Sequence, residues 1–275
     1  MIMKKLVLLI AFFTSLFFSS CEEVVDVDLD SAPPKLVIEA AINWEKGTSG
    51  KLQVIRLSTT TGYFENTIPV VSNAVVFVKN SKDQKFNFTE FNKTGNYVCN
   101  DFKPEINEEY TLTVISKGNT YTASEILKSV APITRIEQKN DGGFTGEDIE
   151  IKTYFTDPAD EDNFYLFKYV YSNKVTANYY VSEDKFYQGN EIFSSAIDED
   201  LKAGDEVEVT HYGISKQYYN YMNILVSIAG SSIGGPFQSP PATVKGNIIN
   251  TTDKNNYPLG YFSLSEISTK KYKIQ

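Results

Sequence analysis

The stretch Tyr110-Thr-Leu-Thr-Val-Ile115 decides the fold class, because its Tyr, Leu and Val recur at every second position. This alternation predicts a half-buried β-strand. Further short segments, rich in apolar and β-branched residues, flank it at close spacing, with turn residues between them: 36–42, 52–58, 70–71, 74–78, 85–89, 95–98 and 120–123. Since no helical period interrupts them, residues 35–131 are expected to form an N-terminal β-sandwich domain.

A domain boundary is expected at Ser129-Val-Ala-Pro132, because proline cannot donate to a strand ladder and biases the preceding residue towards extended backbone. Residues 132–275 would then form a second β-rich domain. Its expected strands are 133–136, 149–155, 164–171, 175–181, 207–212, 243–249 and 259–264. The predicted fold is thus mainly β, with two sandwich-like domains.

One segment departs from the β pattern. In Ser215–Ala229 the residues Tyr218, Met222, Leu225 and Ala229 recur at helical spacing. Ser215 suits an N-cap and Gly230 suits the residue that ends a helix. We therefore predict one amphipathic helix in the second domain, with this stripe facing the core.

The chain begins with the features of a lipoprotein signal peptide. Lys4 and Lys5 precede an apolar run, and Ser19-Ser20-Cys21 follows it, which resembles a bacterial lipobox. Residues 1–20 would be removed and Cys21 would carry acyl chains that hold the protein on a membrane. The alternative is an ordinary secreted protein with a chance cysteine near the cleavage site.

Residues 21–34 form an acidic segment that ends at Pro33-Pro34, which we interpret as a tether. It resembles the acidic segment that directs Bacteroidota lipoproteins to the cell surface. The other interpretation is a plain solvated linker. Without Lys4 and Lys5, the 26 basic residues become 24 against 35 acidic residues, a net charge of −11. This charge argues against nucleic-acid partners and against a polybasic grip on anionic lipid.

Few side chains offer catalysis or metal binding. The sequence holds one histidine, His211, expected to be structural or to face solvent, and Cys99 would have no disulfide partner if Cys21 is lipidated. A zinc site or a Ser-His-Asp triad cannot be assembled from such a set. We therefore predict no catalytic residues, no cofactor and no firm metal site. A weak calcium candidate is Asp157, Asp160 and Asp162, although an Asp-Pro turn explains the same residues.

Aromatic residues of the second domain favour binding without catalysis, because such side chains give rigid contact area at low entropic cost. The candidates lie on two segments expected to form surface loops, 179–193 and 230–241. The alternative is that half of them fill the core. The candidate partner-binding residues are Tyr179, Tyr180, Phe186, Tyr187, Phe193 and Phe237.

Two resemblances add to this interpretation. The order of strands and turns from Val78 to Val114 resembles small transthyretin-like and carboxypeptidase-regulatory-like sandwiches. The acidic start, Tyr154-Phe-Thr-Asp-Pro158, Gly246-Asn-Ile248 and Leu259-Gly-Tyr-Phe262 resemble the Bacteroidota lipoprotein family of the domain of unknown function 4249. The remaining matches are Pro33–Glu39, Pro69-Val70 with Ala74-Val75, Tyr110–Val114 with Tyr121, Phe164-Tyr165, Pro236-Phe237 and Pro240-Pro241.

This resemblance implies an outer-membrane, surface-exposed lipoprotein that serves as a non-catalytic accessory subunit of a TonB-dependent receptor. Its ligand is not implied. A free-standing adhesin or glycan-binding lipoprotein is the alternative, and a hydrolase is a third possibility.

Overall fold

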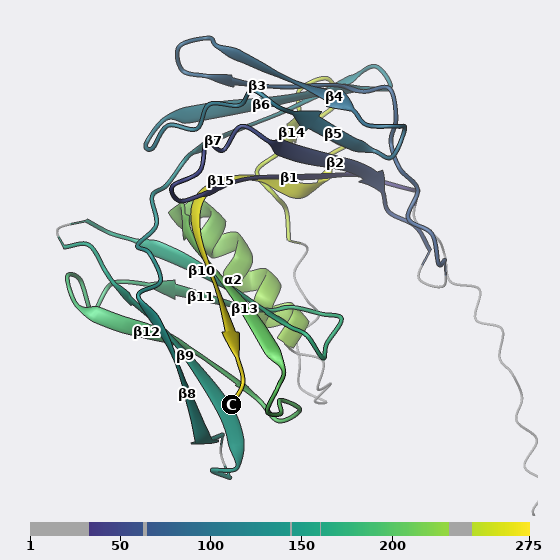
Figure 1. The fold of residues 1–275 in the computed structure, drawn as a ribbon. Coiled ribbons are helices and arrows are strands. Elements are labelled where there is room, and N and C mark those ends of the chain that lie inside the picture. Colours follow the sequence, from purple (N-terminus) through teal and green to yellow (C-terminus); the bar gives the residue numbers. More distant parts are fainter. Residues whose placement is uncertain (1–32, 63–64, 144, 160, 231–243) are drawn as a thin grey trace, which may run out of the picture. The chain divides into compact units, whose positions relative to one another are not determined.

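The computed structural model describes residues 33–62, 65–143, 145–159, 161–230 and 244–275. Strands dominate this part of the chain, and one helix, α2 (Lys216–Gly230), accompanies them (Figure 1). The mainly β fold class is therefore confirmed. The strands are β1 (Leu36–Glu45), β2 (Gln53–Thr59), β3 (Val75–Asn80), β4 (Lys85–Glu90), β5 (Asn96–Cys99), β6 (Glu109–Ser116), β7 (Asn119–Ile126), β8 (Arg135–Gly142), β9 (Asp148–Thr156), β10 (Phe164–Tyr171), β11 (Asn178–Glu183), β12 (Glu191–Asp198), β13 (Glu206–Ile214), β14 (Ile249–Asn250) and β15 (Leu259–Lys273).

The strands form two sheets. A 12-stranded sheet has the order β11-β10-β13-β15-β1-β2-β5-β4-β3-β6-β7-β14, and a 3-stranded sheet has the order β12-β9-β8. Strand β15 joins the two halves of the larger sheet. Its first part pairs in parallel with β1, up to Glu45 opposite Ile267, and its last part pairs antiparallel with β13. It continues nine residues beyond the predicted end at Leu264, through to Lys273.

The first hydrophobic core follows the predicted alternation. Tyr110, Leu112 and Val114 are fully buried, while the residues between them are only partly buried. The Tyr110 hydroxyl donates to the Lys103 carbonyl at 2.7 Å and accepts from the Glu105 amide at 2.9 Å. Such a link from a strand start to upstream backbone resembles the tyrosine corner of immunoglobulin-like sandwiches.

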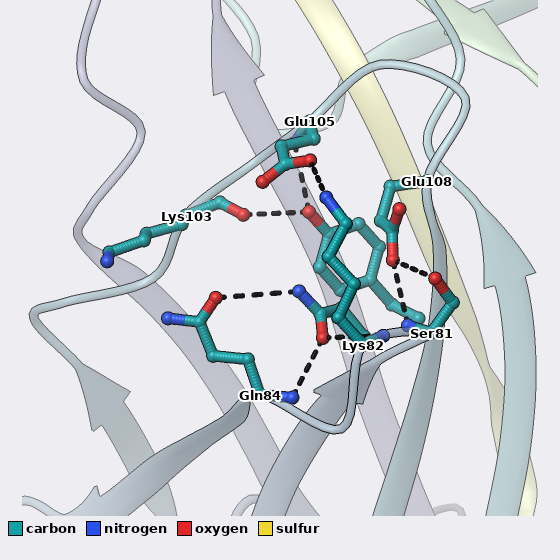
Figure 2. A network of polar contacts seen from close by, with 8 residues as sticks. Ser81, Lys82, Gln84, Lys103, Glu105 and Glu108 are labelled. Carbon is teal, nitrogen blue, oxygen red and sulfur yellow. Dashed lines mark hydrogen bonds and ion pairs between the residues drawn. The ribbon is translucent and has the colours of Figure 1, made fainter.

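Figure 2 shows how polar contacts tie the β3–β4 turn to the segment before β6. Lys82 Nζ pairs with Glu105 at 2.7 Å, and the Ser81 hydroxyl donates to Glu108 at 2.6 Å. The Asn80 side-chain oxygen accepts from two turn amides, those of Lys82 and Gln84. These contacts hold the β3–β4 turn against the segment before β6, so the role of the network is structural.

A second core lies between β8, β9 and β12 on one side and β10, β13 and the end of β15 on the other. The first core draws mainly on residues before the predicted boundary near Pro132 and the second mainly on residues after it, but Ile248, Phe262 and Leu264 belong to the first core and Ala131 to the second. Residues Pro34–Gln275 together form one compact unit. The division into domains 35–131 and 132–275 stays a prediction.

Helix α2 covers β10 and β11, as the sequence period indicates, with Ser215 as its N-cap: the Ser215 hydroxyl accepts from the Tyr218 amide at 3.1 Å. The predicted stripe is wrong in its second half. Leu225 is 39% exposed and Ala229 is exposed, while Tyr221 and Val226 pack against the core in their place. The buried face follows the i to i+4 row Tyr218, Met222 and Val226, because a helix of 3.6 residues per turn places these one above the other.

Several strand predictions need correction. The expected strand 70–71 is only an isolated bridge at Val70, and β11 begins at Asn178, not at residue 175. Strand β12 (Glu191–Asp198) was not predicted, because its alternation starts inside a segment interpreted as a loop. Strand β8 begins at Arg135, not at residue 133. Of the described part of 243–249, only Ile249 lies on a strand, the two-residue β14. No helix among the described residues has the length and apolar character needed to cross a membrane.

Candidate functional site

Five of the six aromatic residues predicted to bind a partner lie along one continuous segment. Tyr179 and Tyr180 lie on β11, Phe186 and Tyr187 in the following turn, and Phe193 on β12. Phe237 and residues 231–243 lie outside the described residues. We call residues 178–198 the β11–β12 seam. The prediction that its aromatics lie on loops is wrong for Phe193, which pairs within β12, while Tyr179 and Tyr180 lie on β11, which overlaps the strand expected at 175–181.

Strand pairing places both ends of the seam at sheet edges. Strand β11 pairs with β10 as the last strand of the larger sheet, and β12 pairs with β9 as the last strand of the smaller one. The chain therefore passes from one layer to the other through residues 184–190. Among the described residues, one edge of each of these two strands therefore has no neighbouring strand.

The turn between the two strands is held by many hydrogen bonds. Buried Asp184 accepts from the Asn163 amide at 2.7 Å, and the Asp184 amide donates to the Asn163 carbonyl. The Tyr187 amide donates to the Asp184 carbonyl, and the Tyr187 hydroxyl bonds to the Ser182 hydroxyl. On this fixed turn the Phe186 side chain is 87% exposed. A large aromatic group is thus presented to solvent on a preorganised support.

Two hollows lie along the seam. The larger, about 580 Å³, begins at Glu183 and lies among aromatic, charged and amide side chains, among them Phe164, Phe186, Tyr187, Gln188, Asp162 and Lys216. The smaller, about 210 Å³, lies between residues 180–182 of β11 and 192–195 of β12, with Phe155 and Phe167 also lining it. The seam therefore combines an end with charged, amide and aromatic side chains and an end with aromatic, aliphatic and serine side chains.

Some predicted residues also fill the core, as the alternative interpretation proposed. Tyr180 is half-buried, with its ring edge-on to that of Tyr169 at a centroid distance of 5.5 Å. Tyr187 is half-buried as well, and burial raises the pKa of its hydroxyl. Tyr179 and Phe193 are 37% and 45% exposed. Phe186, Phe193 and Tyr179 are thus the seam aromatics open to a partner.

The acidic residues of the calcium candidate do not converge. Asp157 is buried, accepts from the Tyr165 hydroxyl at 2.5 Å, and has a raised pKa because of burial and, to a smaller extent, the nearby Asp184 charge. Asp162 accepts from Gln188 at 3.2 Å, and Asp160 lies outside the described residues. Within the described ranges, no group of three or more His, Cys, Asp or Glu side chains is arranged to hold a metal ion.

His211 is enclosed by aromatic rings, not exposed on its strand. Its ring stacks on Phe167 at 4.3 Å, and Phe155 and Tyr165 lie within 5 Å. Burial lowers the pKa of His211 to about 3, and burial raises the pKa of Cys99 to about 11. Neither group is available as a general base or nucleophile near neutral pH.

A ladder of surface side chains next to the seam was not predicted from the sequence. On the 3-stranded sheet Arg135, Tyr154 and Phe193 lie in register. The Arg135 guanidinium lies 3.7 Å from the Tyr154 ring centre, and Lys152 Nζ lies 4.4 Å from that of Phe193. The alternation of Glu150, Lys152 and Tyr154 in β9 was the signal available, because it marks a polar outer face.

Comparisons with solved structures find matches of low similarity. A segment of two fibronectin type-III domains from chicken tenascin shares 13% identity, covering 66% of this chain and 90% of that chain, with a TM-score of 0.22. A cytokine receptor complex shares 8% identity over 67% and 86%, with a TM-score of 0.27. The FN1-FN3 domains of chicken CNTN1 share 15% identity over 66% and 63%, with a TM-score of 0.25.

A search of curated proteins finds no match. A family model described as "Domain of unknown function (DUF4249)" matches residues 22–271, which is nearly the whole chain after Cys21. The protein therefore belongs to the DUF4249 family, as its sequence motifs predict.

Proposed function

We propose that this protein is a lipid-anchored, non-catalytic binding protein of the outer membrane, exposed at the cell surface, whose β11–β12 seam contacts a partner. The observation that carries the binding role is Phe186, 87% exposed on a turn fixed by hydrogen bonds and next to a hollow of about 580 Å³. Removal of the segment before Cys21 is supported by Lys4 and Lys5, the apolar run after them and Ser19-Ser20-Cys21, which resembles a lipobox.

The partner proposed is a TonB-dependent outer-membrane barrel, to which the protein is an accessory subunit. This rests on the resemblance to Bacteroidota lipoproteins and is an argument by analogy. The alternative is a free-standing adhesin or glycan-binding lipoprotein. The amide groups of Gln188 and Asn190 beside Phe186 favour that alternative, because amides and aromatic rings suit sugar hydroxyls and sugar faces.

Anchoring is tested by replacing Cys21. The Cys21→Ala protein should appear in the soluble fraction and take up no labelled fatty acid, because the thiol is the proposed acylation site. A Cys99→Ala variant is the matched control and should remain acylated. Unchanged labelling of Cys21→Ala would show that the segment is not a lipobox.

Partner binding is tested with two exposed phenylalanines. Phe186 is 87% exposed on the seam, and Phe91 is 59% exposed on the β4–β5 turn of the first half. The assay is cross-linking in intact cells, with the partner identified by mass. Phe186→Ala should reduce the amount of captured barrel at least tenfold. The Phe91→Ala control should capture normally, and both should melt like the wild type. Equal capture by both variants would refute the seam as the binding surface.

A further inference from the structure

We propose that β11 receives an extended segment of the partner polypeptide as an additional strand along its free edge. This deepens the proposed function and rests on it. The occupant is a peptide with apolar residues at alternate positions and polar or charged residues towards the end that meets Glu183. Three features of the seam carry the inference: unpaired backbone groups, an unprotected edge, and the hollows beside it.

The unpaired groups follow from the pairing of β10 and β11. The Asp184 amide donates to the Asn163 carbonyl, so the backbone N–H and C=O groups of Asp184 face the neighbouring β10 side. Because inward and outward residues alternate in an antiparallel ladder, Tyr179, Val181 and Glu183 direct their N–H and C=O groups to the free edge. Within the described residues, these groups make no hydrogen bond. Strand β11 has 6 residues, so at ~3.3 Å per residue it offers about 20 Å of backbone with which another strand can pair.

Two of the other three edges, those of β8 and β14, carry features that discourage pairing. Strand β8 presents Arg135, Glu137 and Lys139 and has an irregular register before Gly142. Strand β14 has only 2 residues. Strand β11, Asn-Tyr-Tyr-Val-Ser-Glu, has no lysine, proline or register shift. Strand β12, like β11, has no lysine, proline or register shift, but of these two strands only β11 lines both hollows. Edge strands are usually blunted by such features, so an edge of Tyr-Tyr-Val without them is suited to strand addition.

The hollows indicate what the added strand carries. Residues 180–182 line the hollow of about 210 Å³ together with Ile192, Phe193 and the rings of Phe155 and Phe167. An added strand would direct alternate side chains between the two layers, and this hollow has room for one large apolar side chain. The row of backbone donors and acceptors matches another strand, which a glycan or an acyl chain does not reproduce.

Charged side chains lie at the Glu183 end of β11. Glu183 ends β11 and begins the hollow of about 580 Å³, which also holds Asp162, Lys185 and Lys216. In the part of the chain described, Lys185 and Lys216 form no ion pair. Side chains of both signs in one hollow complement a polypeptide with mixed charge at that point better than a uniformly charged ligand.

The experiment uses the full mature chain and a displayed library of ten-residue peptides with Val, Ile, Phe or Tyr at every second position. A library of equal composition with proline at every third position is the control. Binding should enrich the alternating library and slow amide hydrogen exchange at Tyr179, Val181 and Glu183 at least tenfold. Sedimentation should show a monomer with one peptide bound.

Two variants at one position separate backbone from side-chain contacts. Tyr179→Pro removes an outward N–H without breaking the β10–β11 ladder and should weaken peptide binding at least tenfold. Tyr179→Ala keeps the N–H and removes only the side-chain contact, so it should weaken peptide binding clearly less than Tyr179→Pro does. The exchange measurement needs no variant, so it decides the matter if the proline variant melts early.

Equal enrichment of both libraries, exchange protection elsewhere, or a dimer formed through β11 would overturn strand addition. The proposed function has a separate readout. If Phe186→Ala loses the barrel while the β11 amides stay unprotected in the captured complex, the seam binds by another mode. If Phe186→Ala captures normally and β11 is also unprotected, both proposals are wrong.

Discussion

Removal of the Lys46 charge should destabilise the fold far more than removal of a surface lysine with an ion pair of the same length. Glu266 is buried on β15, near the point where this strand changes partner from β1 to β13. It accepts from Lys46 Nζ at 2.8 Å and from the Val130 amide at 3.0 Å. Three distant segments thus meet at one carboxylate.

The magnitude follows from burial. The Glu266 side chain is 6% exposed and that of Lys46 is 42% exposed. A hydrogen bond to a charged group contributes about 1.5–3 kcal/mol, and partial solvation of Lys46 reduces this. We expect Lys46→Met to lower the free energy of unfolding by about 1–2 kcal/mol, with each kcal/mol costing roughly 2–4 °C in melting temperature. Lys46→Met with Glu266→Gln should recover part of the loss, because a buried neutral amide costs less than a buried unpaired carboxylate.

The matched control is Lys82→Met. Lys82 pairs with Glu105 at 2.7 Å, but these side chains are 63% and 48% exposed. Urea unfolding monitored by circular dichroism should show no measurable change for Lys82→Met, since exposed pairs contribute little. Equal midpoints for Lys46→Met and Lys82→Met, or a double variant less stable than Lys46→Met, would refute the assignment of Glu266 as a buried charge that depends on Lys46.

Two buried tyrosines should respond oppositely to loss of the hydroxyl. Tyr110→Phe should lower the free energy of unfolding by about 1–3 kcal/mol in urea, because two backbone groups lose their hydrogen-bond partner. Tyr171→Phe should be neutral or stabilising, because the Tyr171 hydroxyl has no hydrogen-bond partner within the described residues. A destabilised Tyr171→Phe variant would contradict this. His211 is neutral when folded, with a pKa of about 3, and protonates in the unfolded chain below about pH 6.5. Its contribution to stability is therefore complete above that pH and is lost as pH falls towards 3, by up to about 1.4 kcal/mol per pH unit. His211→Phe should flatten the decline of the unfolding free energy between pH 7 and pH 4, and an unchanged slope would show that the imidazole is solvated.

Sequence periodicity determined the secondary structure well where one face of an element is buried. Tyr110, Leu112 and Val114 alternate because one side of β6 packs on the core, and Tyr218 and Met222 are spaced by a helical turn because α2 covers a sheet. The burial of apolar side chains selects these periods, so local sequence carries them. Motif order was sufficient to identify the family.

Sequence periodicity predicted burial and strand positions less well where contacts with several strands or with a turn decide the environment of a residue. Leu225 fits a helical stripe, but it is exposed because the sheet beneath α2 follows the Tyr218, Met222 and Val226 row. The sequence does not predict strand β12, because Ser194 and Ser195 obscure the alternation of its apolar residues.

The candidate site depended on contacts between residues far apart in the chain. The sequence indicated that Tyr179–Phe193 is rich in aromatics, but not which rings are covered. Tyr180 is covered because Tyr169 lies on the neighbouring strand, and Phe186 is exposed because Asp184 bonds to Asn163 and fixes the turn outward. The free edge of β11 likewise exists only because β12 pairs with β9 in the other sheet. Local sequence determined which segments are strands, and tertiary packing decided which edges and rings remain open, because burial is a property of neighbours and not of a segment alone.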